Sequence, residues 1–402
     1  MYPNLYFAFL DLLGWDLPAL KLINSFGFFV ALAFVVAHSL LRSELKRMTA
    51  LGHFAPSSRT ERIGEPPHPM DLGMQALMGF LLGWKVLYLV VNAGDLFQGG
   101  GLPQAHLFST EGNVVWGVLG ALALTGWRYW EVQQARLPEP KTVTVEVPPQ
   151  EHVGGVTAAA AIGGIAGAKL FHLLEYPDEF VAFLQAPSLS AFLGGLTIYG
   201  GLIVGGLSVY VYARRHNLNF LKLADGTAPG LLLAYGIGRI GCQVSGDGDW
   251  GIPNPKPKPG WLSWAPDWVW SYAYPNNVNG VYGPRSAGYT GKLIDPNVHP
   301  FPAFEGYGTY LDPAVFPTPI YETTAAALGF AMLWAMRTKW AKPGQIFAAY
   351  LMFNGFERFW IEKIRVNTTF DLVGITMTQA ELISVCTFLS GVALWVWTTR
   401  RN

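Results

Sequence analysis

The chain has 402 residues, of which 51% are hydrophobic and 13% are charged, and its formal net charge is zero. A soluble protein of this length carries more charge on its surface, so the composition excludes an ordinary soluble enzyme and indicates a polytopic membrane protein. The balanced charge gives no reason to expect a nucleic-acid partner. Two cysteines, Cys242 and Cys386, lack the spacing of a metal site or of a disulfide framework, so neither is expected.

Nine segments are long and apolar enough to cross about 30 Å of hydrocarbon as helices. Basic residues gather in every second connection, which predicts an N-terminus outside the cell and a cytoplasmic C-terminus. The expected fold is therefore an all-α polytopic membrane protein with about nine transmembrane helices and a small external cap. The spans are expected at residues 20–41, 71–91, 113–130, 153–174, 192–213, 224–244, 319–336, 344–361 and 380–397.

The connections between these spans divide the chain into parts. Residues 56–69 and 137–150 are rich in proline and charge and are interpreted as solvated cytoplasmic linkers. The largest connection, residues 248–317, is rich in tryptophan and tyrosine, and we interpret it as a small external cap whose tryptophans rest among lipid headgroups. The expected parts are N-terminal spans with linkers at 1–150, glycine-rich core spans at 151–247, the cap at 248–317 and C-terminal spans at 318–402.

One arginine, Arg239, lies among glycines near the end of the sixth expected span, and carboxylates follow it. A charge at mid-membrane costs roughly 2.5–3.5 kcal/mol on insertion scales, so such a residue usually faces a cavity and marks a site. The expected topology brings polar residues from four spans to the outer side of the membrane. They are Tyr199, Arg239, Asp247, Tyr321, Glu322, Glu357, Arg358, Glu362 and Arg365.

The last three of these residues have the spacing of a single helix face. Ion pairs that only lock helices together would explain Arg358 with Glu362. They do not explain the whole set, because buried ion pairs rarely improve stability over apolar packing. The cluster therefore predicts a pocket for an anionic headgroup.

Four sequence blocks resemble the prolipoprotein diacylglyceryl transferase family. They are GGLTIYGGLI before an ARR turn, GRIGCQVSGDGDWG, PTPIYE and GFERFWIEKIR. The resemblance implies a multi-pass enzyme of the bacterial inner membrane whose active site faces the periplasm. Such an enzyme transfers the diacylglyceryl group of phosphatidylglycerol to the lipobox cysteine thiol of exported preproteins. It forms a thioether, releases glycerol phosphate, and needs no cofactor or metal.

The resemblance also implies roles for individual residues. Arg239 would hold the lipid phosphate, and Arg358 would be the second essential arginine. The catalytic candidates are Arg239, Arg358, Tyr199, Asp247 and Glu362. The lipid-binding candidates are Arg239, Gly200, Gly201, Gly241, Gly251, Tyr321, Glu322 and Arg365.

The chain also departs from the family pattern. Tyr199 stands at the position of the family's candidate catalytic histidine, Cys242 stands at a signature asparagine, and the second and third spans look like an insertion into the usual seven. The general base is therefore open. Tyr199 is one candidate, as a hydrogen-bond donor or a tyrosinate, and Asp247 and Glu362 are the others.

Two other functions compete with this interpretation. A transporter for an anionic solute would have matching halves, broken helices and charges at mid-membrane, and the sequence has neither repeat nor such charges. A non-catalytic homologue that binds lipoproteins or lipid stays open because of the departures at Tyr199 and Cys242.

Overall fold

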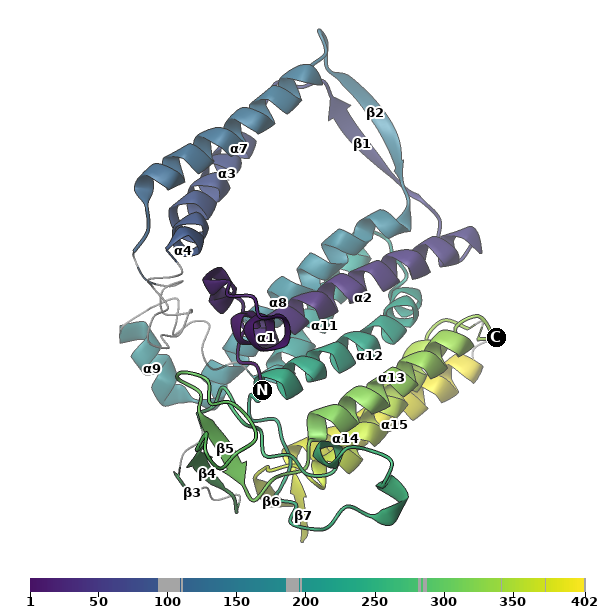
Figure 1. Ribbon diagram of the computed structural model, residues 1–402. Helices are drawn as coiled ribbons and strands as arrows, with labels where there is room; N and C mark the ends of the chain where they lie inside the picture. Colours follow the sequence, from purple (N-terminus) through teal and green to yellow (C-terminus); the bar gives the residue numbers. More distant parts are fainter. Residues whose placement is uncertain are drawn as a thin grey trace. The chain divides into compact units, whose positions relative to one another are not determined.

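The computed structural model describes residues 1–92, 109, 111–185, 195, 197–280, 283–284, 288–340, 342–372 and 374–400. The chain forms two compact units (Figure 1). Unit 1 consists of Met1–Gly14, Ile23–Phe54 and Leu218–Asn402, and unit 2 consists of Trp15–Leu22 and Ala55–Asn217. The start of the fifth expected span, at residues 192–194 and 196, and Arg401 lie outside the described residues.

Unit 1 is a helix bundle. Its described helices are α1 (Leu5–Leu13), α2 (Ser25–Ala50), α12 (Phe220–Ser245), α13 (Thr318–Met336), α14 (Gln345–Glu362) and α15 (Gln379–Arg400). Helix α12 packs against α2, α13 and α14, while α14 also packs against α15. The core between α12, α13 and α14 is formed by Ala228, Leu232, Leu333, Ile346 and Ala349.

A smaller part of unit 1 follows α12. It contains the 3₁₀ turns η4 (Gly260–Leu262) and η5 (Asp267–Val269) and an antiparallel sheet in the order β3 (Gly283–Pro284), β4 (Thr290–Leu293) and β5 (Thr309–Asp312). Trp250, Tyr274, Leu311 and Val315 form its own apolar core. Between α14 and α15, β6 (Thr369–Leu372) and β7 (Ile375–Thr378) pair as a hairpin.

Among its described residues, unit 2 contains two packed helix pairs and a β-ribbon. The described elements are η1 (Pro18–Leu22), β1 (Ser57–Ile63), α3 (Pro69–Leu81), η2 (Leu82–Leu87, a π-helical turn), α4 (Tyr88–Val91), α7 (Val114–Gln134), β2 (Lys141–Val147), η3 (Pro149–His152), α8 (Val153–Glu175), α9 (Pro177–Gln185) and α11 (Ile198–Arg215). Helix α3 packs on α7, and α8 packs on α11. Both contacts are close because glycines meet there, as small residues do between membrane helices. A Cβ added at Gly79 would lie 2.3 Å from the Gly120 carbonyl oxygen.

The two proline-rich segments that flank the α3–α7 pair are mostly exposed, as expected of linkers, but they are not independent of each other. Strands β1 and β2 pair with each other in an antiparallel ribbon, from Ser57 opposite Val147 to Ile63 opposite Lys141. This pairing leaves no local signal in the sequence, because both strands are polar and the α3–α7 helix pair separates them in the chain.

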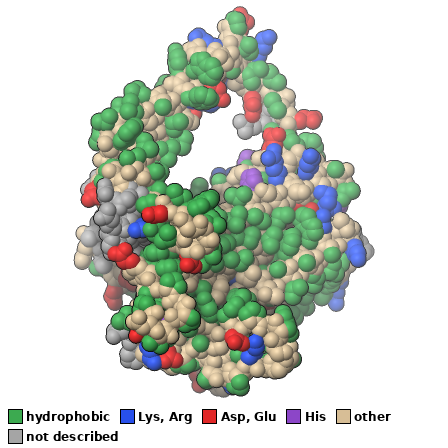
Figure 2. Space-filling model, in the orientation of Figure 1, with side chains coloured by type: hydrophobic (Ala, Val, Ile, Leu, Met, Phe, Trp, Pro, Cys, Tyr) green, Lys and Arg blue, Asp and Glu red, His purple; other side chains and the backbone are tan. Residues whose placement is uncertain are grey.

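The chain is a mostly helical, multi-pass membrane protein. By length and composition, four helical segments among the described residues can cross a membrane: Ser25–Ala50, Pro69–Val91, Pro149–Glu175 and Gln379–Arg400. The other five expected spans coincide with α7, α11, α12, α13 and α14, but nine crossings stay a prediction. Figure 2 shows a broad apolar surface on this face of unit 1, and the exposed large apolar side chains of α2 lie in the first half of the helix, as expected of a segment that faces lipid.

Candidate functional site

The end of α12 and the loop after it build the site. Gly246 ends the helix with a positive φ of 65°, and the chain turns back so that Asp249 reaches Arg239. The loop is held on two sides. Thr318, at the start of α13, donates from its hydroxyl to the Asp249 carbonyl at 2.7 Å. The backbone N–H of Ile252 donates to the Ile364 carbonyl, just after α14, at 2.8 Å.

Close packing explains the glycines on either side of this loop. A Cβ at Gly251 would lie 2.4 Å from the Ile364 carbonyl oxygen, so the backbone approach that pairs Gly251 with Arg365 requires glycine. Gly241 faces α2, where a Cβ would lie 2.9 Å from the Cβ of Phe29. Close packing thus explains why both positions are glycine, and their expected contact with lipid stays a prediction.

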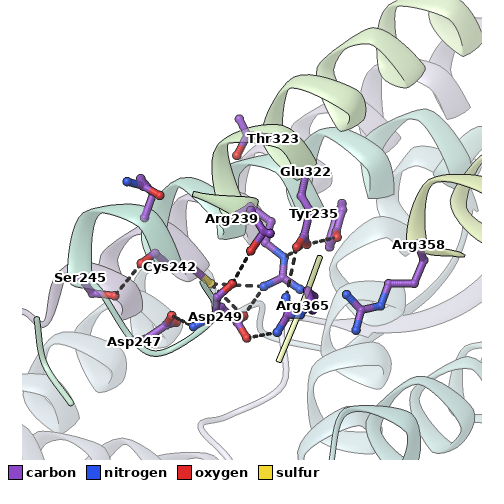
Figure 3. Close-up of polar contacts among 12 residues, drawn as sticks. Tyr235, Arg239, Cys242, Ser245, Asp247, Asp249, Glu322, Thr323, Arg358 and Arg365 are labelled. Carbon is purple, nitrogen blue, oxygen red and sulfur yellow. Dashed lines mark hydrogen bonds and ion pairs between the residues drawn. The ribbon is translucent and has the colours of Figure 1, made fainter. Parts of the chain in front are cut away.

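Two arginines and two carboxylates form a closed ring, which we call the arginine–carboxylate ring: Arg239, Asp249, Arg365 and Glu322 (Figure 3). Arg239 pairs through Nη1 with Asp249, and its Nε lies 2.5 Å from Glu322 Oε2. Arg365 closes the ring, with Nη2 2.5 Å from Asp249 Oδ1 and Nη1 3.1 Å from Glu322 Oε1. The ring therefore joins the end of α12, the loop after it, α13 and the segment after α14.

Burial makes the ring an unusual electrostatic feature. The side chains of Glu322, Arg365 and Arg239 are 0%, 11% and 12% exposed. Tyr235, one helical turn before Arg239, donates its hydroxyl to Glu322. Two positive and two negative charges balance, which is the condition under which buried charges are tolerated.

The two aspartates of the loop differ in their surroundings. Burial works to raise the pKa of Asp249, but the guanidinium groups of Arg239 and Arg365 outweigh it and hold that pKa well below its ordinary range. Burial raises the pKa of Asp247, and the neighbouring Asp249 carboxylate raises it further. Asp249 is therefore firmly ionised, whereas Asp247 takes up a proton more readily.

Arg358 lies beside the ring and not in it. One of its nitrogens, Nη2, is 2.9 Å from Glu362 Oε2. Its Nη1 and the Nε of Arg365 are buried, and neither has a hydrogen-bond partner among the described residues. Figure 3 shows the Arg358 side chain reaching from α14 toward Arg365. Two guanidinium groups thus each keep one buried donor nitrogen without a hydrogen-bond partner in the described part of the chain.

The expectation of a single helix face for Arg358, Glu362 and Arg365 is wrong. Helix α14 ends at Glu362, and Arg365 lies in the extended segment that pairs with Gly251. This turn away from the helix brings Arg365 to Arg239. The arginine that shares carboxylates with Arg239 is consequently Arg365, and not Arg358.

The other candidate residues lie in different places. Tyr321 donates its hydroxyl to the Val269 carbonyl at 2.8 Å and so ties α13 to the loop after α12. Tyr199, Gly200 and Gly201 belong to α11 in unit 2, and their part in the site stays a prediction. Gly200 faces α8, where an added Cβ would lie 2.4 Å from the Gly167 carbonyl oxygen.

Asp249 and Tyr235 were not among the expected catalytic or lipid-binding residues, although Asp249 is one of the carboxylates that follow Arg239 in the sequence. The signal for Asp249 was its place two residues after Asp247 in a glycine-rich loop, where either carboxylate could face Arg239. The signal for Tyr235 was its spacing of four residues from Arg239, which puts both on one side of a helix.

The loop also contains a group of atoms that could hold a metal ion. The ligand atoms of Cys242, Asp247 and Asp249 lie within 4.8 Å of one another. A cation bound there would sit beside the two guanidinium groups that already occupy Asp249. Repulsion between like charges makes the ring a poor metal site.

Comparison with known proteins decides the family. The model of the prolipoprotein diacylglyceryl transferase family matches residues 106–397, which include every residue of the ring. The chain belongs to the prolipoprotein diacylglyceryl transferase family. This confirms the resemblance seen in the four sequence blocks.

Individual relatives of this transferase agree. The phosphatidylglycerol–prolipoprotein diacylglyceryl transferase of Corynebacterium efficiens is 27% identical over 286 residues, which are 70% of this chain and 75% of that protein. The protein of the same name from Bordetella avium is 28% identical over 247 residues, 60% of this chain and 76% of that protein. The one from Cutibacterium acnes is 28% identical over 221 residues, 54% and 62% of the two chains.

Proposed function

We propose that this transferase moves the diacylglyceryl group of phosphatidylglycerol onto the cysteine thiol in the lipobox of exported prolipoproteins. A thioether forms and glycerol phosphate is released. Membership of the family and the names of the relatives, which contain both substrates, support this reaction. The observation that carries it is the buried arginine–carboxylate ring with Arg358 beside it.

The lipid phosphate would bind at the guanidinium donors that the ring leaves unused. These are Nη1 of Arg358 and Nε of Arg365. A phosphate that accepts both hydrogen bonds would gain charge-assisted contacts from two planar cations. Arg239, held by Asp249 and Glu322, would fix the position of Arg365 through the shared carboxylates.

The same donors would assist the chemical step. The acceptor thiolate attacks the glycerol carbon that is bonded to the phosphate oxygen, and the C–O bond breaks toward phosphate. Negative charge grows on the leaving oxygen, where fixed positive groups in a water-poor site stabilise it most. The nucleophile belongs to the acceptor protein, so the enzyme needs no nucleophile of its own. The candidate bases from the sequence, Tyr199, Asp247 and Glu362, remain part of this proposal.

The proposal extends to the placement of the enzyme. Nine spans, an external N-terminus and a cytoplasmic C-terminus would put the ring on the periplasmic side of a bacterial inner membrane, with residues 248–317 as a cap. The parts at 1–150, 151–247, 248–317 and 318–402 follow from this topology. Trp261 and Trp264, 74% and 81% exposed, support contact of the cap with headgroups. The proposed partners are phosphatidylglycerol, lipobox preproteins and membrane lipids, with neither cofactor nor nucleic acid.

A peptide assay tests the reaction. Purified protein in detergent is incubated with phosphatidylglycerol and a synthetic lipobox peptide, and the peptide mass is measured. We expect the mass to rise by one diacylglyceryl group, with an equal amount of glycerol phosphate released. A peptide with serine in place of the cysteine should not change.

Two results would contradict the proposal. Peptide that binds with no change in mass would indicate the non-catalytic homologue. Labelled glycerol phosphate that crosses sealed vesicles with no peptide product would indicate a transporter.

A further inference from the structure

One carboxyl group beside the ring, that of Glu357, has no role in the reaction as proposed above. Glu357 lies on α14, immediately before Arg358, and is 8% exposed. The position of Gly355 on the same helix shows the direction in which the Glu357 side chain points. An added Cβ at Gly355 would lie 2.6 Å from the Ser384 carbonyl oxygen of α15. Two residues along a helix is a rotation of about 200°, so Glu357 faces away from α15 and toward α12 and α13.

Glu357 differs from the other buried carboxylates of the site in its partners. Glu322 is paired with Arg239 and Arg365, and Glu362 is paired with Arg358. The structure gives Glu357 neither a hydrogen bond nor an ion pair with any described residue, and its Oε1 is fully buried without a partner. A buried polar atom without a hydrogen bond is destabilising, and more so when it is charged.

Charged and titratable groups surround this carboxyl from each packed element. They are Tyr235 and Arg239 on α12, Glu322 on α13, Arg358 on α14 itself and Arg365 after it. On α15, Glu381 is paired with Lys363. Three arginines and one carboxylate thus lie around a carboxyl group that has no fixed partner of its own. A carboxyl group without a fixed partner is suited to taking up and returning a proton.

We propose that Glu357 carries the proton of the reaction, taking it from the acceptor thiol and giving it to the departing glycerol phosphate. This rests on the function proposed above. The S–H bond breaks and its proton goes to the Glu357 carboxylate. A sulfur electron pair forms the S–C bond as the C–O bond breaks, and the electron pair of the C–O bond leaves with the phosphate oxygen. The proton then passes from Glu357 to the phosphate, so no proton is gained or lost.

The other carboxylates near the ring are worse proton acceptors. Asp249 and Glu322 each bind two guanidinium groups, and Glu362 binds Arg358 and Asn367. Bonds to cations favour the ionised form and weaken a carboxylate as a base. Asp247 accepts a hydrogen bond from the Asp249 backbone N–H at 3.3 Å and is the remaining rival among these carboxylates.

The test compares Glu357→Gln and Glu357→Asp with Glu381→Gln. Glu381 is also a buried carboxylate, but it pairs with Lys363 and binds the Thr378 backbone N–H at 2.9 Å, so it serves as the matched control. The full-length protein in detergent is assayed with phosphatidylglycerol and the lipobox peptide between pH 6 and pH 9.5. The melting temperature of each variant is measured as well.

We expect Glu357→Gln to lower kcat by about 10²–10⁴-fold at pH 7 with little change in KM. The loss should shrink as the pH passes about 8.5, where the free thiol ionises without a base. Glu357→Asp should retain part of the activity, and Glu381→Gln should stay within about twofold of wild type. The melting temperature of Glu357→Gln should be unchanged or higher, because a buried carboxyl group without a partner is removed.

Three results would overturn the inference. One is a Glu357→Gln enzyme with wild-type kcat at every pH. A second is a loss by the same factor at every pH, which indicates a structural role. The third is Asp247→Asn giving the pH-dependent loss that Glu357→Gln does not. If wild type itself forms no thioether, the proposed function fails; if wild type reacts and only these variants behave otherwise, the inference about Glu357 fails alone.

Discussion

Arg239 and Arg358 both lie in the candidate site, but their contacts differ. Arg239 belongs to the arginine–carboxylate ring, and Arg358 lies beside it. Arg239 bridges Asp249 and Glu322, which a single ammonium group cannot do with the same geometry. Arg358 has one ion pair and one unused donor. The two residues should therefore respond differently to the same substitution.

We expect Arg239→Lys to lower the melting temperature by several degrees and to abolish transfer, because a broken buried pair costs about 3–5 kcal/mol. Arg358→Lys can keep its pair with Glu362 and should leave the melting temperature nearly unchanged. It should lower kcat/KM for phosphatidylglycerol at least about 10-fold, through the lost phosphate donor. Thermal unfolding and steady-state kinetics check both. Normal kcat/KM in Arg358→Lys would remove Arg358 from phosphate binding.

Ionisation of Asp249 should make the stability of the protein depend on pH. Its pKa is lowered by Arg239 and Arg365 from an ordinary value of 3.8. A carboxyl group with a depressed pKa in the folded state contributes stability above its unfolded pKa, and this contribution is lost as the pH falls through the folded pKa. The melting temperature of Asp249→Asn should thus lie below that of wild type by a constant margin from pH 8 to pH 5. This difference in melting temperature should narrow below about pH 4. A difference that narrows near neutral pH would contradict the pairing of Asp249 with Arg239 and Arg365.

At the scale of elements, apolar length predicted most helices well. The expected spans at 153–174 and 319–336 correspond to α8 and α13 within a residue or two, because a run of that length must satisfy its backbone within itself in lipid. The β1–β2 ribbon was not predicted, because pairing between distant polar strands leaves no local signal in the sequence. The end of α14 at Glu362 was not predicted either, and therefore the position of Arg365 in the ring was missed.

The close contact of α12 with α2 gives a prediction for two glycines on one helix. Gly241→Ala puts a Cβ 2.9 Å from Phe29 and should lower the free energy of unfolding by about 1–3 kcal/mol. At Gly238, three residues earlier, an added Cβ meets nothing within 4 Å. Gly238→Ala should leave stability unchanged or raise it, because alanine favours the helix. Equal melting temperatures for the two variants would show that α12 and α2 do not pack so closely.

At the scale of the whole molecule, the ring lies entirely in unit 1, while the α3–α7 pair belongs to unit 2 and lies in the chain between the two strands of the β1–β2 ribbon. Ile63 and Lys141 are opposite each other in that ribbon, so the segment between them can be replaced by a two-residue Asn-Gly turn. We expect the shortened protein to fold and to transfer diacylglyceryl at a rate within about threefold of wild type. A folded but inactive product would give the α3–α7 pair a part in the reaction.

The central claim is that a lipid phosphate binds at the unused donors beside the arginine–carboxylate ring. A cryo-electron microscopy map of the protein in phosphatidylglycerol nanodiscs tests it most directly. We predict a phosphate whose oxygens lie about 3 Å from Nη1 of Arg358 and from Nε of Arg365, with the ring of Arg239, Asp249, Arg365 and Glu322 intact. An intact ring sealed from lipid, with phosphatidylglycerol bound elsewhere on the chain, would contradict the account.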